Sequence, residues 1–427
     1  MATVIPFQAW RYNLERVRID RVVAPPYDVI SREEQEALYG RDPFNIVKVE
    51  CGKVEVSDNE LHNQYERAAK YWESWIQQSV IQQDKVKSFY LLSTLFKDPE
   101  SGEKKRRLVI FGLIKLEPFE ARVVLPHEKT HAGAKEDRLK LLQTTKTNFS
   151  PVFGLYEDKQ KLAHSLYSAY ASIPPLFSFS LENGEEHQLW QISSLTDVQN
   201  LSQMFESKSI LIADGHHRYE TALYYRNLDR SKRDQNGLLS SDYVLMGFVE
   251  VEDEGLLILP IHRVVKNLKG INPTKFVEEL TGFFSIKKTS EDKLHAIARG
   301  GSDQGFGLAL PTANFYFWLK DKAEARKEML PGKPESWYGL EVTQISYLVL
   351  KRLGIREEAL EHYVEYTRSS EEAIQHVKAR KANLAFIVPP IKAKVMREIC
   401  MAGELMPQKS TYFYPKLGSG ILMYRHE

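Results

Sequence analysis

The stretch SILIADGHHRYETALYYRN, residues 209–227, predicts a strand, a tight turn and a helix in direct succession. The run KSILI at 208–212 favours a buried strand that ends at Ala213. Gly215 allows the backbone to turn sharply, and apolar residues recur at helical spacing from Tyr219 onward. This order of elements is the first indication of a fold that combines sheet and helix around one turn.

The turn itself places four polar or charged side chains and a glycine at consecutive positions, 214–218. Amide groups at a helix start, freed by Gly215, can bind an anion, and Arg218 adds a planar fork suited to phosphate. Asp214 could cap the turn or hold Mg²⁺, and His216 and His217 could donate hydrogen bonds or transfer protons. Any one of these residues could simply be solvated, but the five together favour an anion site. At this turn a transition-metal site is disfavoured, because adjacent histidines diverge and residues 209–227 contain no HxH or HExxH pattern.

A second polar cluster lies upstream in LPHEKTHAGAKEDRLKLL, residues 125–142. His127, Glu128, Lys129 and His131 fall within five positions, in a loop that is expected to follow a strand. Glu128 could act as a general base if its surroundings tune it, and Lys129 or His131 could neutralise a phosphoryl donor. The alternative interpretation is a solvated charged loop.

Further candidate substrate contacts are scattered along the chain. They lie in three short motifs, APPYDVIS, LPIHRVV and KSTYFYPKLGSG, and comprise Tyr27, Asp28, His127, His262, Arg263, Lys409, Ser410, Thr411 and Lys416. The first motif could equally be a structural turn with a helix cap. The second is as well explained by structure as by ligand contact, and the aromatic residues of the third suit either a nucleobase or a core.

Strand and helix patterns alternate along the chain, which predicts a mixed α+β fold. Strand pairs are expected at 86–96 with 106–118, within 173–193 around Asn183-Gly184, and within 242–267 around an acidic turn; helices are expected at 58–83, 135–146, 195–206, 274–283, 291–298, 340–353 and 356–362. The polar stretches 228–238 and 299–305 are expected to be surface loops.

Composition narrows the class of protein. The chain has 427 residues, a formal net charge of +1 and two cysteines, Cys51 and Cys400. Neither a disulfide framework nor a cysteine zinc site is expected, and the balanced charge gives no indication of nucleic-acid binding. The sequence shows no signal peptide and no apolar run long enough to span a membrane, so a cytoplasmic protein without a membrane partner is expected.

Together these motifs resemble a known family. IPF, APPYDVIS, LPHEKTHAGAKEDRLKLLQTTKTNFSPVFGLY, IADGHHRYETAL, LPIHRVV and KSTYFYPKLGSG look like the landmarks of the domain-of-unknown-function 1015 family, in order from near residue 4 to near residue 421. The segment from about 121 to 227 further resembles the core of the ParB/sulfiredoxin superfamily. That resemblance implies a nucleotide- or phosphate-binding core at 121–230, with an N-terminal α+β segment at 1–120 that contributes to the site and a C-terminal α+β segment at 231–427.

Within that superfamily the free-serine kinase branch fits best. The reactive cysteine of sulfiredoxin is missing from the turn at 214–218, and no helix-turn-helix typical of ParB is evident. The kinase resemblance implies a phosphate cradle at 214–218 and Glu128 as the catalytic carboxylate. It implies ATP, ADP or pyrophosphate as phosphoryl donor, with Mg²⁺ near Asp214, and a small hydroxylated acceptor such as free L-serine.

Two other functions remain open from the sequence. One is a ParB-like regulatory switch that binds a nucleotide and changes its partner contacts. The other is a phosphohydrolase that uses the same site with water as acceptor. The expected partners are therefore a small-molecule substrate and a phosphoryl donor, and a homodimer is a candidate oligomeric state.

Overall fold

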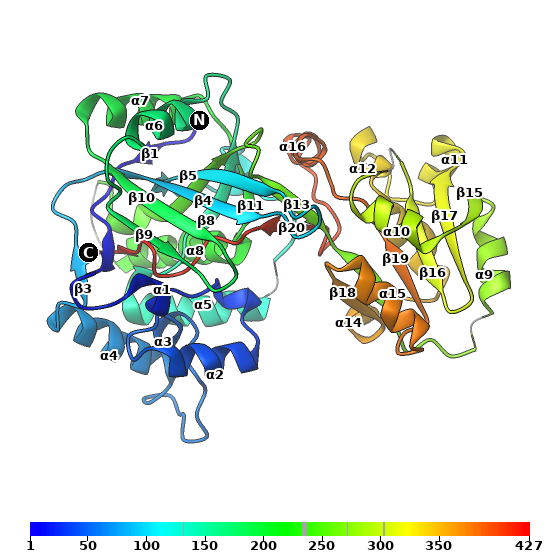
Figure 1. Ribbon diagram of the computed structural model, residues 1–427, viewed down its shortest axis with the longest axis horizontal. Coiled ribbons are helices and arrows are strands. Elements are labelled where there is room, and N and C mark those ends of the chain that lie inside the picture. The colour runs from blue at the N-terminus through cyan, green and yellow to red at the C-terminus, as the bar shows by residue number, and fades with distance from the viewer. Residues whose placement is uncertain (131, 233–236, 271, 302–303) are drawn as a thin grey trace. The chain divides into compact units, whose positions relative to one another are not determined.

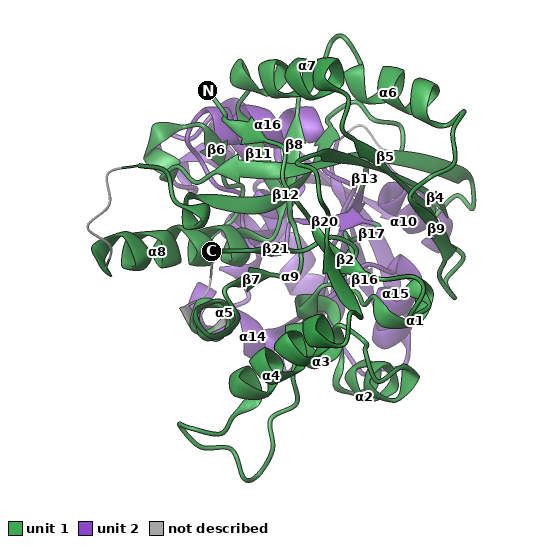
Figure 2. Ribbon diagram, turned by 90° about the vertical axis from the view of Figure 1, so that its left-hand side faces the viewer, with its two compact units in different colours: residues 1–257, 415–427 green, residues 258–414 purple. Residues whose placement is uncertain are grey.

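The computed structural model describes residues 1–130, 132–232, 237–270, 272–301 and 304–427, and the chain forms two compact units. Unit 1 comprises Met1–Leu257 and Pro415–Glu427, and unit 2 comprises Ile258–Tyr414 (Figure 2). These units do not follow the expected division into 1–120, 121–230 and 231–427. Strands from all three of those segments share one sheet in unit 1, and its closing segment comes from the end of the chain.

Unit 1 is built around a mixed sheet with the order β6-β11-β8-β12-β5-β4-β10-β9, and β1 also pairs with β5. Its strands are β1 (Val4–Ile5), β2 (Trp10–Tyr12), β3 (Ile81–Gln83), β4 (Phe89–Lys97), β5 (Lys104–Lys115), β6 (Val124–Leu125), β7 (Thr147–Asn148), β8 (Val152–Tyr156), β9 (Phe177–Ser180), β10 (Glu186–Ile192), β11 (Ile210–Asp214), β12 (Tyr243–Glu250) and β21 (Tyr424–Arg425). β11 runs parallel to β6 and β12 runs parallel to β8, while the other pairs in the large sheet are antiparallel.

Helices cover both faces of this sheet. They are α1 (Ile19–Val22), α2 (Arg32–Arg41), α3 (Val47–Glu50), α4 (Gln64–Gln77), α5 (Ala132–Thr145), α6 (Leu162–Tyr170), α7 (Leu195–Glu206) and α8 (His216–Lys232), with short 3₁₀ turns at Tyr27–Val29, Phe119–Ala121 and Ser240–Asp242. Figure 1 shows α6 and α7 on one side of the sheet and α4 and α5 on the other. All eight residues of β12 are buried, as expected for a central strand covered on both faces.

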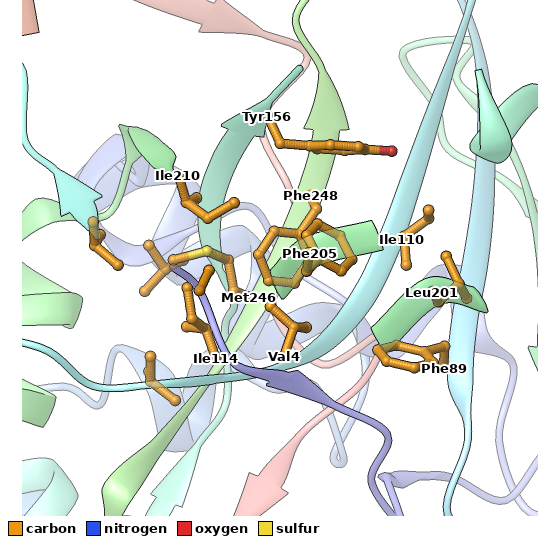
Figure 3. Packing of buried hydrophobic residues seen from close by; sticks show 14 of the residues in the cluster. Val4, Phe89, Ile110, Ile114, Tyr156, Leu201, Phe205, Ile210, Met246 and Phe248 are labelled. Carbon is orange, nitrogen blue, oxygen red and sulfur yellow. The ribbon is translucent and has the colours of Figure 1, made fainter. Parts of the chain in front are cut away.

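Aromatic side chains fill the core under α7. The ring of Phe205 lies 4.5 Å from that of Phe248 and 5.1 Å from that of Tyr156, measured between centroids (Figure 3). Val4 of β1 and Met246 of β12 belong to the same cluster. Truncating such a buried phenylalanine to alanine typically costs about 3–5 kcal/mol, so this packing contributes strongly to the stability of unit 1.

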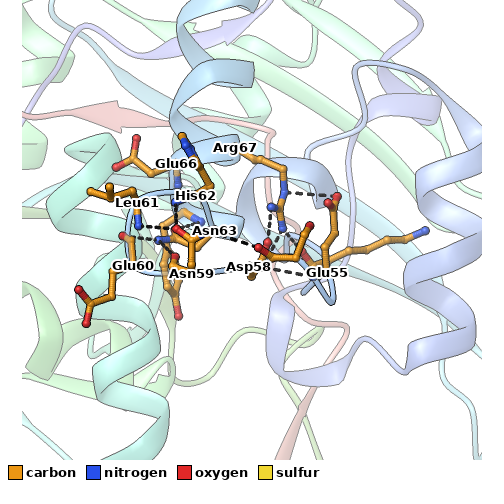
Figure 4. Close-up of polar contacts among 12 residues, drawn as sticks. Glu55, Asp58, Asn59, Glu60, Leu61, His62, Asn63, Glu66 and Arg67 are labelled. Atoms are coloured by element: carbon orange, nitrogen blue, oxygen red, sulfur yellow. Dashed lines mark hydrogen bonds and ion pairs between the residues drawn. The ribbon is translucent and has the colours of Figure 1, made fainter.

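The helix expected at 58–83 is shorter than predicted, because a polar loop precedes α4 and β3 follows it. Asn63 caps α4 by accepting hydrogen bonds from the backbone N–H groups of Tyr65 at 3.0 Å and Glu66 at 3.2 Å. Arg67, in the first turns of α4, pairs with Asp58 at 2.5 Å and fastens the loop (Figure 4). Capping and this ion pair explain why the helix begins at Gln64.

Several predicted elements are confirmed. The two strands predicted at 86–96 and 106–118 are β4 and β5, which pair antiparallel, and those within 173–193 are β9 and β10. Gly184 has a φ of +83°, the left-handed conformation expected of that turn. The helix predicted at 195–206 is α7, with those bounds.

The strand pair expected within 242–267 was wrong. β12 is embedded in the large sheet between β5 and β8, whereas β13 (Leu257–Pro260) pairs with β20 (Thr411–Tyr414). The chain passes from unit 1 to unit 2 at this point, so consecutive strands join different sheets. The loop expected at 228–238 was also placed too early, because α8 continues to Lys232.

Unit 2 contains a second sheet with the order β15-β17-β16-β19-β14-β18. Its strands are β14 (His262–Val265), β15 (Phe284–Thr289), β16 (Phe306–Leu310), β17 (Ala313–Leu319), β18 (Val364–Thr367) and β19 (Leu384–Ile387), and its helices are α9 (Pro273–Leu280), α10 (Glu291–Ala298), α11 (Lys322–Lys327), α12 (Glu335–Gly339), α13 (Glu341–Gln344), a π-helical turn (Ile345–Leu350), a 3₁₀ turn (Glu357–Ala359), α14 (Leu360–Tyr363), α15 (Ser370–Lys378) and α16 (Ala393–Met401). Apolar residues of α10 and α15 pack on this sheet. Within the described ranges, no helix combines the length and apolar character needed to cross a membrane.

Two buried histidines predict loss of stability in acid. Burial lowers the pKa of His426, in unit 1, to about 4 and that of His262, in unit 2, to about 3, from an ordinary value of 6.5. The stability that each contributes is complete above pH 6.5 and is lost as the pH falls toward the lowered value. We expect each histidine to cost its unit about 1.4 kcal/mol of unfolding free energy per pH unit below 6.5.

Urea unfolding of the full chain between pH 7.5 and pH 5 measures this dependence. His426→Gln should reduce the pH slope of unit 1 and leave that of unit 2 unchanged. An unaltered slope in unit 1 would contradict the assignment of a buried, neutral His426.

Candidate active site

The strand, turn and helix predicted at 209–227 are present in unit 1. β11 ends at Asp214, Gly215 has a φ of +84°, and α8 begins at His216. Tyr219 N donates to the carbonyl of Gly215 at 3.0 Å, which starts the helical hydrogen bonding. The N–H groups at a helix start lack acceptors within the helix and lie at the positive end of its dipole. The turn therefore has the geometry of an anion site.

Arg218 folds back against this turn. Its Nη2 donates to Oδ2 of Asp214 at 2.8 Å, and its Nη1 donates to the carbonyl of Pro151. A Cβ at position 215 would lie 2.9 Å from Nε and 3.0 Å from Cζ of Arg218, so only glycine leaves room for the guanidinium. Arg218 thus ties the start of α8 to the end of β11 and to the segment before β8.

Gly215→Ala is expected to destabilise unit 1 by roughly 2–5 kcal/mol. The left-handed backbone costs an alanine about 1–2 kcal/mol, and crowding against Arg218 adds about 1–3 kcal/mol. Gly184→Ala is the matched control, because Gly184 has nearly the same φ, +83°, and open space around the added Cβ. Urea unfolding that shows equal losses in both variants would contradict the crowding at Gly215.

Asp214 lies between two cations. Lys416 Nζ pairs with Oδ1 and Arg218 pairs with Oδ2, and the three side chains of Asp214, Arg218 and Lys416 are 14, 9 and 11% exposed. Burial alone would raise the pKa of Asp214, but the charges of Lys416 and Arg218 outweigh burial and hold it below its ordinary range. Asp214 is therefore a charged carboxylate that positions two cations at the turn.

Magnesium does not fit Asp214 in this arrangement. Mg²⁺ takes oxygen ligands, and both carboxylate oxygens of Asp214 already accept hydrogen bonds from cationic side chains. A metal ion on either oxygen would lie directly beside a cationic side chain that is already bound there. The residues present thus supply a side-chain ammonium where the sequence resemblance implied a metal ion.

Lys416 reaches the turn from the last segment of the chain. Arg107, which is fully buried, donates to the carbonyl of Pro415, and the side chain of Leu417 packs on Gly247 of β12. Ser419 forms a β-bridge with Ala24. The C-terminal segment therefore crosses unit 1 beside the APPYD motif, and its fixed path sets the position of Lys416.

His127, Glu128 and His216 form the second half of the site. The backbone N–H of His127 donates to Nε2 of His216 at 3.2 Å, so Nδ1 carries the proton of the neutral His216 ring. That Nδ1 lies 3.7 Å from Oε1 of Glu128. Burial, followed by the neighbouring His127, lowers the pKa of His216 well below its usual value. His216 is thus a neutral residue facing Glu128, whose side chain is 31% exposed.

His127 is itself held in place. Its Nδ1 lies 2.7 Å from the carbonyl of Ile212 in β11, and its ring meets that of His216 edge-on at 4.5 Å. These contacts fasten the PHEKT loop to the end of β11, next to the turn. The proximity of the two motifs, which the sequence resemblance implied, is a feature of the structure.

A buried ionic network lies behind the turn. Glu50 accepts a hydrogen bond from Ser150 Oγ at 2.7 Å, and its Oε1 lies 3.6 Å from Nη1 of Arg138. Arg138 lies over the ring of Tyr27 at 3.9 Å. Glu50, Ser150, Arg138 and Arg218 line one small cavity of about 40 Å³, room for an ordered water. Sequence reasoning missed Glu50 and Ser150, because nothing in their spacing distinguishes a buried carboxylate from a surface one.

Lys129 of the PHEKT loop and His217 of the turn are less buried than His127 and His216. Lys129 is exposed, His217 is half-buried in the first turn of α8, and His131 lies outside the described residues. Thr130 Oγ1 donates to Glu220 of α8 at 2.9 Å, and Lys135 of α5 pairs with the same carboxylate. These contacts join the loop to α8 beside the turn.

Five other candidate contacts belong to unit 2. His262 and Arg263 lie in β14, Ser410 is buried, Lys409 is exposed and Thr411 begins β20. His262 Nδ1 accepts a hydrogen bond from Val388 N at 3.2 Å, and Arg263 donates to the carbonyls of Ile261 at 2.5 Å and Lys409 at 3.2 Å. Burial lowers the pKa of Arg263 to about 10. Within unit 2 the side chains of His262 and Arg263 therefore join β14 to neighbouring segments.

Comparison with known proteins places the chain in a family. A family model described as a protein of unknown function, DUF1015, matches residues 4–343. The chain belongs to this DUF1015 family. Among proteins with curated descriptions, none matches this DUF1015 protein.

Solved structures similar to this DUF1015 protein include a conserved hypothetical protein from Pyrococcus furiosus, at 16% identity over 72% of this chain and 92% of that one, with a TM-score of 0.35. A free serine kinase in complex with AMP matches at 16% identity over 71% of this chain and 86% of that one, with a TM-score of 0.35. C-terminally truncated SbnI from Staphylococcus aureus matches at 11% identity over 71% and 84%, with a TM-score of 0.34.

The site of this DUF1015 protein combines three chemical capabilities. The start of α8 can bind an anion, and Lys416 brings a positive charge to it. Glu128 is a solvent-accessible carboxylate beside a histidine that stays neutral. A bound anion, a cation and a proton acceptor at one turn suit the transfer of a charged group to a hydroxyl.

Proposed function

We propose that this DUF1015 protein is a small-molecule kinase that transfers a phosphoryl group from ATP, ADP or pyrophosphate to a hydroxyl group, with free L-serine as the leading acceptor. The observation that carries the proposal is the position of Glu128, 3.7 Å from neutral His216 at the turn that opens α8. Because His216 carries no positive charge, it does not neutralise Glu128, and the carboxylate remains able to accept a proton.

In the proposed reaction Glu128 takes the proton of the acceptor hydroxyl. The acceptor oxygen then bonds to the terminal phosphorus of the donor, and the bond from that phosphorus to the donor's bridging oxygen breaks. The electron pair leaves with ADP, AMP or phosphate, according to the donor. Phosphoryl transfer depends mostly on positioning and charge neutralisation, and this site offers both.

In this proposal the turn at 214–218 binds the negatively charged phosphoryl group. Backbone N–H groups from Gly215 onward, together with His217, donate to the phosphoryl oxygens in this proposal, and Lys129 approaches the donor from the loop. Lys416 supplies the positive charge, held by Asp214. Arg218, bonded to Asp214 and Pro151, keeps the turn in shape.

Phosphorus-31 NMR of the full chain with each donor and L-serine tests the proposal. The expected result is a phosphoserine signal that requires both donor and acceptor. Phosphate release without any acceptor would replace the kinase with a phosphohydrolase. Saturable nucleotide binding without turnover, for every donor and a panel of hydroxylated metabolites, would replace it with a nucleotide-dependent switch.

A further inference from the structure

Besides Glu128, a second carboxylate near the turn, Asp28, has no directly paired cation among the described residues. Asp214 is neutralised by Lys416 and Arg218, and Glu50 is paired with Arg138. Asp28 is exposed, and within the described ranges its side chain makes no ion pair and no hydrogen bond with another residue. Asp28 is therefore open to an external partner.

Asp28 is brought to the turn by the backbone before it. Ala24 bridges to Ser419, with Ser419 N donating to the carbonyl of Ala24 at 2.8 Å, so the APPYD segment runs beside the one that carries Lys416. Tyr27, next to Asp28, lies under the guanidinium of Arg138 at 3.9 Å. These two contacts fix the 3₁₀ turn Tyr27–Val29 from both sides, and Asp28 projects from a rigid support.

The surroundings of Asp28 favour a positively charged ligand. Crowding by protein atoms and the negative charge of Asp214 raise the pKa of Asp28, although Arg218 and Lys416 act in the opposite direction. Asp28 is thus exposed and lies close enough to the negative charge of Asp214 to be repelled by it. A cation bound to Asp28 would relieve the repulsion between the two carboxylates.

We infer that Asp28 forms a subsite for an organic ammonium group beside the phosphate turn, so that the acceptor is a hydroxylated primary amine. The inference rests on the proposed function, whose acceptor hydroxyl must lie near Glu128. Asp28 and Glu128 then divide the acceptor between them: one carboxylate holds the ammonium and the other takes the proton of the hydroxyl.

An ammonium suits this subsite better than a metal ion. A single carboxylate with exposed oxygens can accept charge-assisted hydrogen bonds from –NH₃⁺, which needs no further protein ligand. Mg²⁺ demands near-octahedral oxygen coordination, and the neighbouring carboxylate, Asp214, has both oxygens bonded to cations. The geometry therefore selects a ligand that one carboxylate can hold.

Equilibrium dialysis of the full chain against L-serine and 3-hydroxypropionate tests the inference. The two probes differ by the ammonium group alone. The native protein is expected to bind L-serine about 10- to 100-fold more tightly, and Asp28→Asn should reduce that preference to less than about threefold. Asp20→Asn is the matched control, because Asp20 lies on the same segment and is paired with Arg18 at 2.8 Å.

Nucleotide affinity should change less than about threefold in Asp28→Asn, because the substitution removes an acceptor contact only. A preference for L-serine that survives in Asp28→Asn, or that is absent from the native protein, overturns the ammonium subsite. A preserved preference with a raised Mg²⁺ requirement for nucleotide binding would instead make Asp28 a metal ligand. If no phosphoryl transfer occurs while the dialysis preference is lost in Asp28→Asn, the kinase proposal fails and the subsite stands.

Discussion

Glu128→Gln is expected to lower phosphoryl transfer by about 100- to 10,000-fold, the usual contribution of a general base. Glutamine preserves the size of the side chain but cannot accept the proton of the acceptor hydroxyl. His216 cannot replace it, since burial lowers the pKa of His216 well below its usual value and makes it a weak base. Single-turnover kinetics with labelled donor measure the loss, and donor affinity, measured by dialysis, should stay within about threefold.

The control for this experiment is Glu136→Gln on α5. Glu136 is an exposed carboxylate whose one ion pair among the described residues is with Lys140, one turn along the helix. Its removal should leave transfer unchanged. If Glu128→Gln turns over within a few-fold of the native rate, Glu128 is not the base. The proposed division of the site into a proton acceptor and an anion cradle would then have to be abandoned.

Local signals in the sequence predicted the turn well. An apolar run followed by Asp214 and Gly215 predicted a strand that ends at Ala213 and a tight turn after it. β11 ends one residue later, at Asp214, and both features depend only on neighbouring residues. The strand pair at β4 and β5 was predictable for the same reason, because a polar turn joins two apolar runs. The PHEKT loop lies close to the turn because β6 and β11 are parallel neighbours. The family resemblance implied that the two motifs form one site, but not this strand pairing.

Long-range pairing could not be predicted in the same way. Asp214 and Lys416 lie 202 positions apart, and nothing local shows that the chain returns to unit 1 after passing through unit 2. The sequence therefore suggested a metal ion for Asp214, where the structure supplies an ammonium. Likewise, the apolar runs of β12 and β13 looked like partners, although each finds its partner in a distant strand.

Asp214→Asn is expected to destabilise unit 1 by about 3–5 kcal/mol, the typical cost of leaving a buried charge without its partner. Asparagine has the shape of aspartate but leaves Lys416 and Arg218, both nearly buried, facing a neutral amide. Hydrogen exchange in peptides covering β11 and the start of α8, together with urea unfolding, measures the loss within unit 1. Asp20→Asn, which removes the partner of the exposed Arg18, should cost at most about 1 kcal/mol.

The pH dependence of this loss distinguishes the contribution of the negative charge of Asp214 from that of its shape. Because Lys416 and Arg218 hold the pKa of Asp214 below 3.8 despite burial, its contribution is complete above pH 3.8 and is lost as the pH falls through the lowered value. The difference between native protein and Asp214→Asn should therefore narrow only in strong acid. The double variant Asp214→Asn with Lys416→Met should recover part of the loss, since it removes one of the two uncompensated cations together with the carboxylate. If the losses of the two single variants simply add in the double variant, Lys416 and Asp214 are not coupled. Lys416 would then not be the cation that Asp214 holds at the turn.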